Sequence, residues 1–380
     1  MVEPGRLRTI HLNTERTWRG GEQLTLTLAE GLAKRGHTAD IVAQPGSPMA
    51  ERARAAGLAV HEVRMRSEVD LLAVLALRRI FREHRFDVLH FHTPHSVTLG
   101  GVAAAGARRP DGSPPIRLVN KRTDFSIFRN SFLGLNRLKY TRLVDGVIAD
   151  SRKIEEVLLA DGLPAERVRL VYEGVDLARL AGASGGRLRA ELGIADDAEV
   201  VGNVAHFAPH KAHEDLVRAM PRVLARRPRA LFVLVGQGEL LEPMRELARD
   251  LGVAAAVRFA GFRTDVPDLL DLFDLFVMSS REEGLCTSII DAMAVGTPVV
   301  GTRAGGIPEL VLDGETGLLA PVADPAGLAD AIVRALADRP AAERRAEAAG
   351  RRVREWFSAD AMVEGTLAVY RDWIARRPGG

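Results

Sequence analysis

Two carboxylates eight residues apart, Glu283 and Asp291, have types and spacing that suit the binding of hydroxyl groups. They lie in residues 278–311, MSSREEGLCTSIIDAMAVGTPVVGTRAGGIPELV, which is a stretch of short apolar runs and glycine turns. Apolar residues at helical spacing predict a helix over Cys286–Val295, with Gly296 as its C-cap. One carboxylate therefore lies just before this helix and the other lies inside it.

The elements around this helix predict where the carboxylates lie in a sheet. Apolar runs at Asp274–Met278 and Pro298–Thr302 predict two buried strands, and Gly305-Gly306 turns the chain into a second helix at Ile307–Leu312. Two helix N-termini thus open beyond the carboxyl ends of two strands, where ligands bind in open α/β sheets. Their free N–H groups would hold phosphates, and the carboxylates would accept hydrogen bonds from sugar hydroxyls. We favour this nucleotide-sugar site over the simpler interpretation, in which each acid only complements a helix dipole.

The same stretch resembles the signature of glycosyltransferase family 4, the retaining GT-B enzymes. That signature is a Glu-x7-Glu motif, a small-residue helix end, a Pro-Val-Val strand and a Gly-Gly-Ile-Pro-Glu turn, and here Asp291 replaces the second glutamate. The resemblance implies that Glu283 contacts the donor sugar as a catalytic residue and that Asp291 takes the ribose hydroxyls. It also implies that donor-binding backbone groups come from Gly284, Leu285, Cys286, Thr287 and Ser288.

The first predicted strand, Arg8–Asn13, leads through a glycine pair to a helix over Glu22–Arg35. The connecting loop does not fit G-x-G-x-x-G, which argues against a dinucleotide-dependent dehydrogenase. Gly20 and Gly21 would still let backbone approach a ligand closely. The family resemblance implies that this loop faces the donor pyrophosphate.

Histidines mark the end of the fourth predicted strand, Phe86–Phe91. His90 alternates with apolar residues and fits a hydrogen-bonded core histidine. The resemblance implies that His92 is a catalytic residue placed against the donor sugar, and His95 is a candidate for acceptor binding. The spacing of His90 and His92 could suit zinc, but no further Cys or His lies at ligand spacing. We therefore predict no metal and no cofactor, the nucleotide sugar being a substrate.

Residues after the fifth strand, Ile116–Asn120, are also candidates for acceptor contacts, namely Arg122 and Asp124. The stretch from Phe125 to Arg142 mixes aromatic, aliphatic and basic residues. This mixture suits a contact with an anionic membrane surface or a lipid-linked acceptor. An ordinary amphipathic helix packed on its sheet explains the pattern equally well.

In the second half of the chain, the strand VVGNVA leads into HFAPHK and a helix beginning near Glu214. The family usually carries an Arg and a Lys there that bind the donor phosphates. Lys211 matches the lysine, which makes it a phosphate-binding and catalytic candidate, while His206 stands where the arginine is expected. We predict that His210 and His213 are surface residues. Gly236 allows close ligand approach, and Phe262 and Arg263 resemble the base-binding loop of the family.

The composition predicts a globular protein of two domains, because 380 residues exceed the usual size of one hydrophobic core. We expect domains over residues 1–175 and 188–356, with a terminal helix within residues 357–380 that packs back onto the first. The first residues lack the pattern of a signal peptide. The single cysteine, Cys286, fits a reducing compartment. We expect a cytoplasmic protein, with peripheral contact at the inner face of the plasma membrane left open.

The charge is divided unevenly along the chain. Residues 1–180 contain 28 Lys+Arg and 21 Asp+Glu, a net charge of +7, while the remainder has 24 and 29, a net charge of −5. The first half is therefore expected to meet something anionic. No nucleic-acid motif accompanies this charge, so it favours phospholipid or an anionic glycolipid acceptor. The expected partner besides the donor is a glycan or lipid-linked acceptor.

The strands expected in the first half alternate with helical runs: Arg8–Asn13, Thr38–Ala43, Ala59–Val63, Phe86–Phe91, Ile116–Asn120, Gly146–Ala149 and Val168–Val171. We expect an α/β protein of GT-B architecture, with two Rossmann-like doubly wound parallel sheets facing a cleft. The function implied is retaining, metal-independent transfer of a hexose from a UDP-sugar to a hydroxyl of a cell-envelope glycolipid or polysaccharide. A nucleotide-sugar epimerase of the same fold and a non-enzymatic two-lobed sugar-binding protein are the alternatives.

Overall fold

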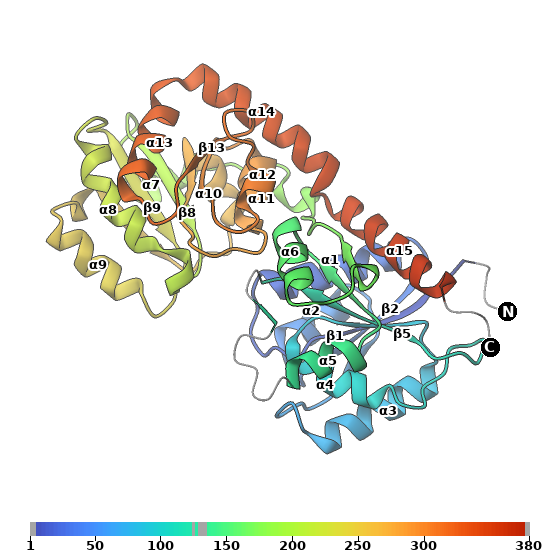
Figure 1. Cartoon of the computed structure of the whole chain (residues 1–380). Coiled ribbons are helices and arrows are strands. Elements are labelled where there is room, and N and C mark those ends of the chain that lie inside the picture. Colours follow the sequence, from blue (N-terminus) through green and yellow to red (C-terminus); the bar gives the residue numbers. More distant parts are fainter. Residues whose placement is uncertain (1–4, 124–125, 128–134, 377–380) are drawn as a thin grey trace. The chain divides into compact units, whose positions relative to one another are not determined.

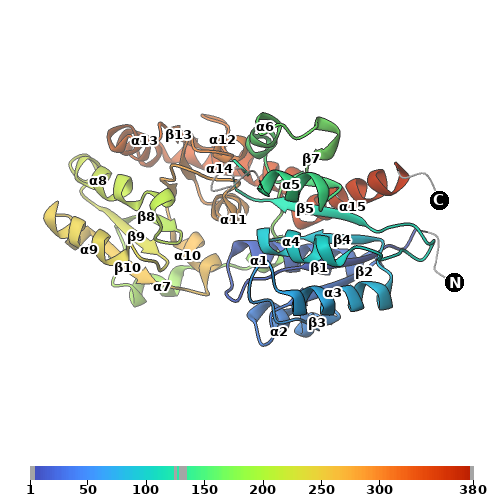
Figure 2. The same ribbon diagram turned by 60° about the horizontal axis from the view of Figure 1, so that its bottom comes forward.

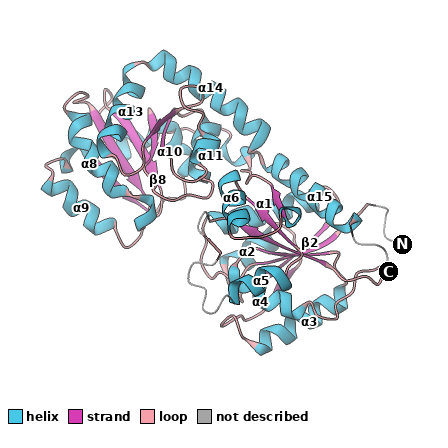
Figure 3. Cartoon of the chain, viewed as in Figure 1, coloured by secondary structure: helices cyan, strands magenta, loops and turns pink. Residues whose placement is uncertain are grey.

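The computed structural model describes residues 5–123, 126–127 and 135–376. The chain divides into two compact units, which we call unit 1 (Met1–Gly174 and Ala359–Gly380) and unit 2 (Val175–Ser358). Each unit is a parallel β-sheet with helices on its faces (Figure 3). The expected doubly wound α/β fold is thereby confirmed for both halves of the chain.

The sheet of unit 1 has seven parallel strands in the order β3-β2-β1-β4-β5-β6-β7 (Figure 1). Its strands are β1 (Arg8–Leu12), β2 (Thr38–Ala43), β3 (Val60–Glu62), β4 (Val88–Phe91), β5 (Ile116–Lys121), β6 (Gly146–Ala149) and β7 (Val168–Leu170). The register pairs His11 of β1 with His90 of β4. The switch in strand order between β1 and β4 is the usual position of a ligand site in such sheets.

Two apolar clusters cover the faces of this sheet. One packs α3 (Leu71–His84), α4 (Pro94–Ala103), α5 (Leu135–Arg142) and α6 (Arg152–Ala160) on one face. The other packs α1 (Gly20–Lys34), α2 (Pro48–Ala55) and the terminal helix α15 (Ala359–Ala375) on the opposite face. A short 3-10 helix, η2 (Ala165–Arg167), precedes β7. Figure 1 shows α3, α4 and α5 on one side of the sheet and α15 on the other.

The sheet of unit 2 has six parallel strands in the order β10-β9-β8-β11-β12-β13. They are β8 (Glu199–Val204), β9 (Ala230–Val235), β10 (Val257–Gly261), β11 (Leu275–Met278), β12 (Val299–Thr302) and β13 (Leu318–Ala320). The helices are α7 (Gly186–Glu191), α8 (His213–Leu224), α9 (Leu241–Asp250), α10 (Val266–Leu272), α11 (Thr287–Val295), α12 (Ile307–Leu310), α13 (Pro325–Ala337) and α14 (Arg339–Trp356). Short 3-10 helices occur at η3 (Leu177–Leu180), η4 (Pro209–Lys211) and η5 (Ala254–Ala256).

The segment between the two expected domains, residues 176–187, belongs to unit 2. It contains η3, which packs on α11, and the start of α7. Val175 pairs with Ser358 in an isolated parallel bridge, and the N–H of Val175 donates to the carbonyl of Phe357 (2.9 Å). Unit 2 therefore begins at residue 175, earlier than the expected 188, because these contacts order the segment.

No helix among the described residues has the length and apolar character needed to cross a membrane.

Candidate functional site

In unit 2, the loop after β8 and the loop after β11 are joined by hydrogen bonds at the carboxyl edge of the sheet. The hydroxyl of Ser279 donates to the carbonyl of Lys211 (3.0 Å). The N–H of Arg281 donates to the carbonyl of His210 (2.8 Å). These bonds bring the predicted phosphate-binding loop and the predicted carboxylate loop together.

The loop after β12 is joined to the same group. The hydroxyl of Thr302 donates to the carbonyl of Ser280 (2.6 Å), and the N–H of Gly306 donates to the carbonyl of Glu283 (3.0 Å). Three loops that are far apart in sequence therefore meet where parallel strands end. This is the position where open α/β sheets bind ligands.

Lys211 and Glu283, both predicted as donor-binding and catalytic residues, form an ion pair. The hydroxyl of Ser280 donates a second hydrogen bond to the Glu283 carboxylate (3.1 Å). Both side chains of the ion pair are mostly buried, at 17% and 12% exposure. Water therefore screens the attraction between the two charges only weakly, and the pair places a cation and an anion side by side in the site.

Asp291 lies inside α11 and is 8% exposed. Burial raises the pKa of its carboxyl, and the guanidinium of Arg179 opposes this by an ion pair and a hydrogen bond. Arg179 comes from η3 and was not predicted as a site residue. The ion pair fixes the carboxylate predicted to accept the ribose hydroxyls.

The start of α11 carries the predicted backbone donors. Cys286 is the N-cap residue and is buried, and Gly284 and Leu285 precede it in the loop. Thr287 and Ser288 form the first turn, whose N–H groups have no partner within the helix. Burial, together with the nearby Glu283 carboxylate, raises the pKa of the Cys286 thiol to about 12. The thiol thus stays protonated and is poorly suited to act as a nucleophile.

The loop after β9 approaches the loop after β8 closely enough to require glycine. Gly236 has φ of +143°, and a Cβ there would lie 1.9 Å from the carbonyl oxygen of Ala205. The N–H of Phe207 donates to the carbonyl of Gln237 (2.9 Å). His206, next to these contacts, is exposed, and its Nε2 lies 3.7 Å from Glu239 Oε2. His206 therefore lies in the loop that carries Lys211, and its role in phosphate binding stays a prediction.

The two residues predicted to lie near the nucleobase follow β10. Phe262 is 64% exposed, which leaves its ring available for stacking. Arg263 is held by Asp265 (Nε to Oδ1, 2.8 Å) and by Glu191 (2.5 Å). These two carboxylates raise the pKa of Arg263, which is therefore a fixed cation bound to protein groups.

The prediction that His213 is a surface residue is wrong, whereas His210 is exposed as expected. His213 has no exposed surface, and its ring stacks on Phe207 with centroids 4.0 Å apart. Burial lowers the pKa of His213 to about 3, with smaller contributions from Lys211 and neighbouring histidines. The sequence suggested a polar loop, but α8 begins at this residue and turns it inward.

In unit 1, three buried histidines from two neighbouring strands form one cluster. His11 of β1 joins His90 and His92, and ligand-capable atoms of all three lie within 4.8 Å of one another. Burial lowers the pKa of each imidazole, in the case of His11 to about 3. The cluster is therefore neutral at physiological pH.

A chain of hydrogen bonds assigns the tautomers of His92 and His11. A guanidinium only donates, so Nη2 of Arg122 donates to Nδ1 of His92 (3.3 Å) and the His92 proton is on Nε2. That Nε2 then donates to Nδ1 of His11 (3.0 Å), whose own Nε2–H points to Oγ1 of Thr9 (3.1 Å). The Thr9 hydroxyl donates to the carbonyl of Thr38 (2.9 Å), which ends the chain. Arg122 thus orders a relay that runs from the end of β5, past the end of β4 and through β1, to β2.

His90 belongs to a separate network. Its Nδ1 lies 2.7 Å from the hydroxyl of Tyr370, and its Nε2 meets Oδ1 of Asn120. Its predicted role as a hydrogen-bonded core histidine is confirmed. All six ring nitrogens of the cluster have protein partners, and Arg122 lies beside it. A metal would have to displace these bonds, so the donor set fits the network better than it fits an ion.

Arg122 also joins two buried carboxylates. Its Nε lies 2.9 Å from Glu173 and 3.5 Å from Asp150. Burial, reinforced by the neighbouring Glu173, raises the pKa of Asp150 well above its usual range. The Arg122 side chain also lies close to Gly21. A Cβ added at Gly21 would be 3.8 Å from it. The Gly20-Gly21 helix start and the predicted acceptor arginine are therefore neighbours.

A cavity of about 520 Å³ opens at the carboxyl edge of the unit 1 sheet. Four cations and three carboxylates line it: Arg19, Lys121, Arg122, Lys139, Glu15, Glu22 and Glu68. His92 also lines it. His95 is exposed, 3.7 Å from Glu68, whereas Asp124 lies outside the described residues. Of the stretch from Phe125 to Arg142, residues 126–127 and 135–142 are described, and the predicted membrane contact there stays a prediction.

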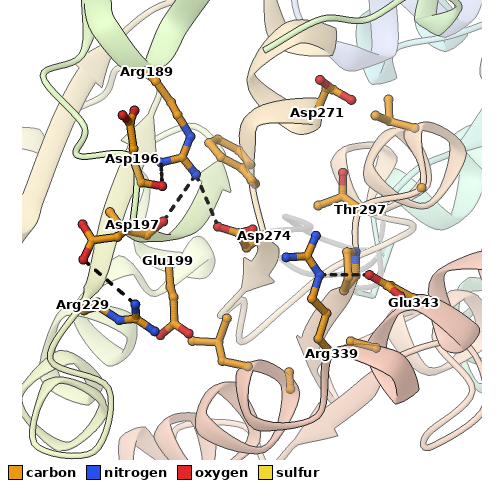
Figure 4. A pocket seen from close by; sticks show the side chains of 18 residues that line it. Arg189, Asp196, Asp197, Glu199, Arg229, Asp271, Asp274, Thr297, Arg339 and Glu343 are labelled. Atoms are coloured by element: carbon orange, nitrogen blue, oxygen red, sulfur yellow. Dashed lines mark hydrogen bonds and ion pairs between the residues drawn. The ribbon is translucent and has the colours of Figure 1, made fainter. Parts of the chain in front are cut away.

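A second cavity of about 520 Å³ lies in unit 2 at the opposite, amino-terminal edge of its sheet (Figure 4). Acidic residues outnumber basic ones in its lining, and its arginines contact carboxylates or carbonyls. Arg189 points to the carbonyls of Ala195 and Asp196, and Arg339 pairs with Glu343 (2.9 Å). None of the predicted site residues lines it. Because it is not at the carboxyl ends of the strands, we do not assign the donor to it.

Sequence reasoning missed Arg179 and His11. Arg179 lay between the two expected domains, and His11 lay on a strand with no motif. The only available signal was the alternation of Thr9 and His11 with apolar residues, which suggests polar groups on one face. Their pairing with Asp291 and His92 depends on contacts between segments about 80 to 110 residues apart.

Two sequence families match the chain. "Glycosyltransferase Family 4" matches residues 18–179, and "Glycosyl transferases group 1" matches residues 186–352. The "Lipopolysaccharide core biosynthesis glycosyltransferase LpsE" of Rhizobium meliloti is 30% identical over 351 residues, 92% of this chain and 94% of its own. A "GDP-mannose-dependent alpha-(1-6)-phosphatidylinositol monomannoside mannosyltransferase" of Mycolicibacterium smegmatis is 32% identical, over 74% of each chain.

The fold is also similar to that of solved structures. The crystal structure of HepE from Anabaena superposes with a TM-score of 0.83 at 22% identity, covering 97% of this chain and 100% of that one. At this identity the similarity concerns the fold.

Proposed function

Since this chain belongs to glycosyltransferase family 4 and is a glycosyltransferase of GT-B fold, we propose that it transfers a hexose from a UDP-sugar to a hydroxyl, with retention of configuration. The observation that carries this proposal is the paired arrangement in unit 2. Lys211 with Glu283, and Arg179 with Asp291, lie around the N-terminus of α11. That combination provides a cation and helix N-terminal amides for a diphosphate and carboxylates for sugar and ribose hydroxyls.

The proposed chemistry needs stabilisation of the leaving group above all. Negative charge grows on the pyrophosphate as the glycosidic bond to it breaks, and Lys211 with the α11 amides would stabilise that charge. Glu283 neutralises Lys211 in the structure, so the donor phosphates would share this cation with the carboxylate. The leaving phosphate would accept the proton of the acceptor hydroxyl, so that no protein base is required.

The names of related proteins support the proposed classes of donor and acceptor. HepE was crystallised with UDP and glucose, which supports UDP as the nucleotide. The relatives named for lipopolysaccharide core synthesis and for phosphatidylinositol mannoside support a cell-envelope glycolipid or polysaccharide as acceptor. The mannosyltransferase is named for GDP-mannose, so GDP-sugars are the donors to compare.

A binding screen followed by product analysis tests the proposal. We expect UDP to raise the melting temperature more than GDP or ADP at equal concentrations. The protein is then incubated with the UDP-sugar that stabilises it most and with an envelope glycolipid extract. NMR coupling constants of the product should show that the transferred sugar keeps the α configuration of the donor. Stabilisation by GDP alone would overturn the choice of UDP, and a β-linked product would overturn retention. Conversion of the donor sugar to its epimer without an acceptor would replace transfer by epimerisation.

A further inference from the structure

Three side chains that the proposed function does not use meet at the edge strand of the unit 1 sheet. Asp40 belongs to β2, His61 belongs to β3, and His84 is the last residue of α3. One ligand-capable atom of each, a carboxylate oxygen or an imidazole nitrogen, lies within 4.8 Å of the other two. We call these three residues the Asp40 cluster. Imidazole and carboxylate groups gathered in this way suit a divalent transition-metal ion.

The register of the sheet and the packing of α3 bring the cluster together. β3 is the edge strand and pairs with β2, so that Val42 lies opposite His61. Because side chains alternate between the two faces of a strand, Asp40 and His61 lie on the same face as Val42. Val42 belongs to the same apolar cluster as Phe81 of α3, so α3 covers this face. The C-terminal end of α3 thereby carries His84 to the edge of the sheet, beside β3 (Figure 2).

Two members of the cluster are paired, whereas the third only contacts them through its ring. Nε2 of His61 lies 2.8 Å from Oδ2 of Asp40, and the two side chains are mostly buried, at 17% and 7% exposure. The ring of His84 meets the ring of His61 edge to face, with centroids 4.8 Å apart, and stacks on Phe86 at 5.8 Å. Within the described part of the chain, the nitrogens of His84 form no hydrogen bond. A simple Asp–His hydrogen bond therefore accounts for two of the three residues.

The charges around the Asp40 cluster suit a cation, in contrast to those around the buried histidines of β1 and β4. There, every ring nitrogen has a protein partner and the Arg122 guanidinium lies alongside. Here, the Asp40 carboxylate supplies negative charge, and among the described residues it pairs with no lysine or arginine. His84 also ends α3, where the helix dipole is negative and favours a cation. An ion has to displace only the bond between Asp40 and His61.

We propose that Asp40, His61 and His84 bind a zinc ion that joins α3 to the edge of the unit 1 sheet. Imidazole nitrogen and carboxylate oxygen are usual zinc ligands, and three protein ligands leave a position for water. Ligand atoms of a tetrahedral zinc site lie about 3.3 Å apart, so separations of up to 4.8 Å have to close by about 1.5 Å at most. Small rotations of the three side chains achieve this.

The role of this ion is structural. None of the three residues lines the cavity at the carboxyl edge of the unit 1 sheet. His84 instead lies where α3 leads into the start of β4, at the amino-terminal edge. β3 has only three residues, so an ion between His61 and α3 would hold a strand that has few hydrogen bonds of its own. The proposed sugar transfer does not depend on it.

No metal motif marks these residues in the sequence. The three are more than 20 residues apart from one another. The expectation of a protein without a metal rested on the local spacing of ligands around His90 and His92. Local spacing does not detect ligands that come from two strands and a helix.

Zinc titration of the full chain tests the proposal. The protein is prepared without a histidine tag, stripped of metal with a chelator and titrated with zinc chloride in a calorimeter, where one ion should bind per chain. At a free zinc concentration of about a hundred times the dissociation constant, the melting temperature of unit 1 should rise by about 5 °C. Mg²⁺ at the same concentration should not raise it, because two imidazoles suit zinc better than a hard cation. Absence of zinc binding, or an equal rise with Mg²⁺, would overturn the proposal.

Substitution of the ligands locates the ion. His84→Gln and Asp40→Asn should each weaken zinc binding by about a hundredfold, because each removes one of three ligands. The visible absorption bands of Co²⁺ bound in place of zinc should disappear in both variants. Without metal, His84→Gln should melt within about 2 °C of the wild type, because the residue is half-buried at a helix end. Loss of binding is then not a consequence of unfolding.

Two exposed histidines provide matched controls. His95→Gln and His206→Gln should leave the zinc affinity unchanged. Unchanged affinity in His84→Gln, or loss of binding in either control, would contradict the assignment. If His11→Gln abolishes binding while His84→Gln retains it, the ion lies in the buried histidine cluster and the proposal is wrong. UDP binding is measured in parallel, so failure of the zinc site is separable from failure of the proposed transferase activity.

Discussion

The two predicted site carboxylates of unit 2, Glu283 and Asp291, have different partners. Glu283 is joined to Lys211 and Ser280, while Asp291 is buried and joined to Arg179. The first pair is predicted to act on the transferred sugar and its leaving group, and the second on the nucleotide. The two sites should therefore respond differently to substitution.

Asp291→Asn should weaken UDP binding by about tenfold, because a charged acceptor of hydroxyl hydrogen bonds becomes a neutral one. Glu283→Gln should lower turnover by about a hundredfold or more and change UDP binding little. Calorimetric titration of UDP and steady-state kinetics measure the two effects. Glu282→Gln, one residue before Glu283, is the control. If Glu283→Gln and Asp291→Asn had the same effect on UDP binding, the division of roles would be wrong.

His213 should make unit 2 sensitive to acid. Its folded-state pKa of about 3 lies below the unfolded value of 6.5, so the unfolded state binds more protons between these values. The titration of His213 therefore costs no stability above about pH 6.5. As the pH drops from there toward 3, the free energy of unfolding falls by up to about 1.4 kcal/mol per pH unit. His213→Phe should remove this slope.

His213→Phe should also stabilise unit 2 at pH 7 by about 1 kcal/mol, because both buried ring nitrogens lack a hydrogen-bond partner within the described residues. Urea unfolding from pH 7 to pH 4 measures both effects, with the exposed His206→Gln as the control. A parallel pH profile for wild type and His213→Phe would contradict the assignment. Nothing in HFAPHKAHE distinguishes the buried histidine from the exposed ones, which is why the sequence placed His213 on the surface.

At the scale of elements, the sequence predicted the strands and the α11 region well. Repeated short apolar runs between glycine turns define parallel strands, and the predicted Cys286–Val295 helix begins one residue before α11. Which strands neighbour one another was not predictable in detail. The pairing of β1 with β4 places His11 opposite His90 and within hydrogen-bonding distance of His92, and no local pattern encodes that register.

The backbone of the loop after β9 is constrained by close contact with the loop after β8. Gly236→Ala should destabilise unit 2 by more than about 2 kcal/mol, because φ of +143° is disfavoured for alanine and its Cβ would clash with Ala205. Gly193→Ala, also at positive φ but with no atom within 4 Å, should cost about 1 kcal/mol. Equal melting temperatures for the two variants would contradict the close approach of the two loops.

At the scale of the whole molecule, unit 1 depends on a helix from the far end of the chain. α15 contributes Met362, Val363, Leu367, Val369 and Tyr370 to the core cluster that covers one face of its sheet. Tyr370 also contacts His90 of β4. The sequence predicted a terminal helix that packs back, but not this bond to the histidine cluster.

Ending the chain after Ser358 should unfold unit 1 and leave unit 2 folded. Each of the large apolar side chains lost contributes about 1.5 to 3 kcal/mol by burial, and together the five contribute an amount comparable to the net stability of a typical domain. Calorimetry should show two transitions for the full chain and only that of unit 2 for the shortened one. A shortened chain with both transitions intact would show that α15 is dispensable.

The return of α15 to unit 1 also determines the order in which the chain can fold during synthesis. Residues 1–174 leave the ribosome first, yet their sheet lacks one covering helix until residues 359–375 have been made. Unit 2 is a continuous segment inserted between the two parts of unit 1, and it is complete earlier. The half that is translated first is therefore the last to mature, and its histidine-bearing strands stay uncovered by α15 until translation is nearly finished.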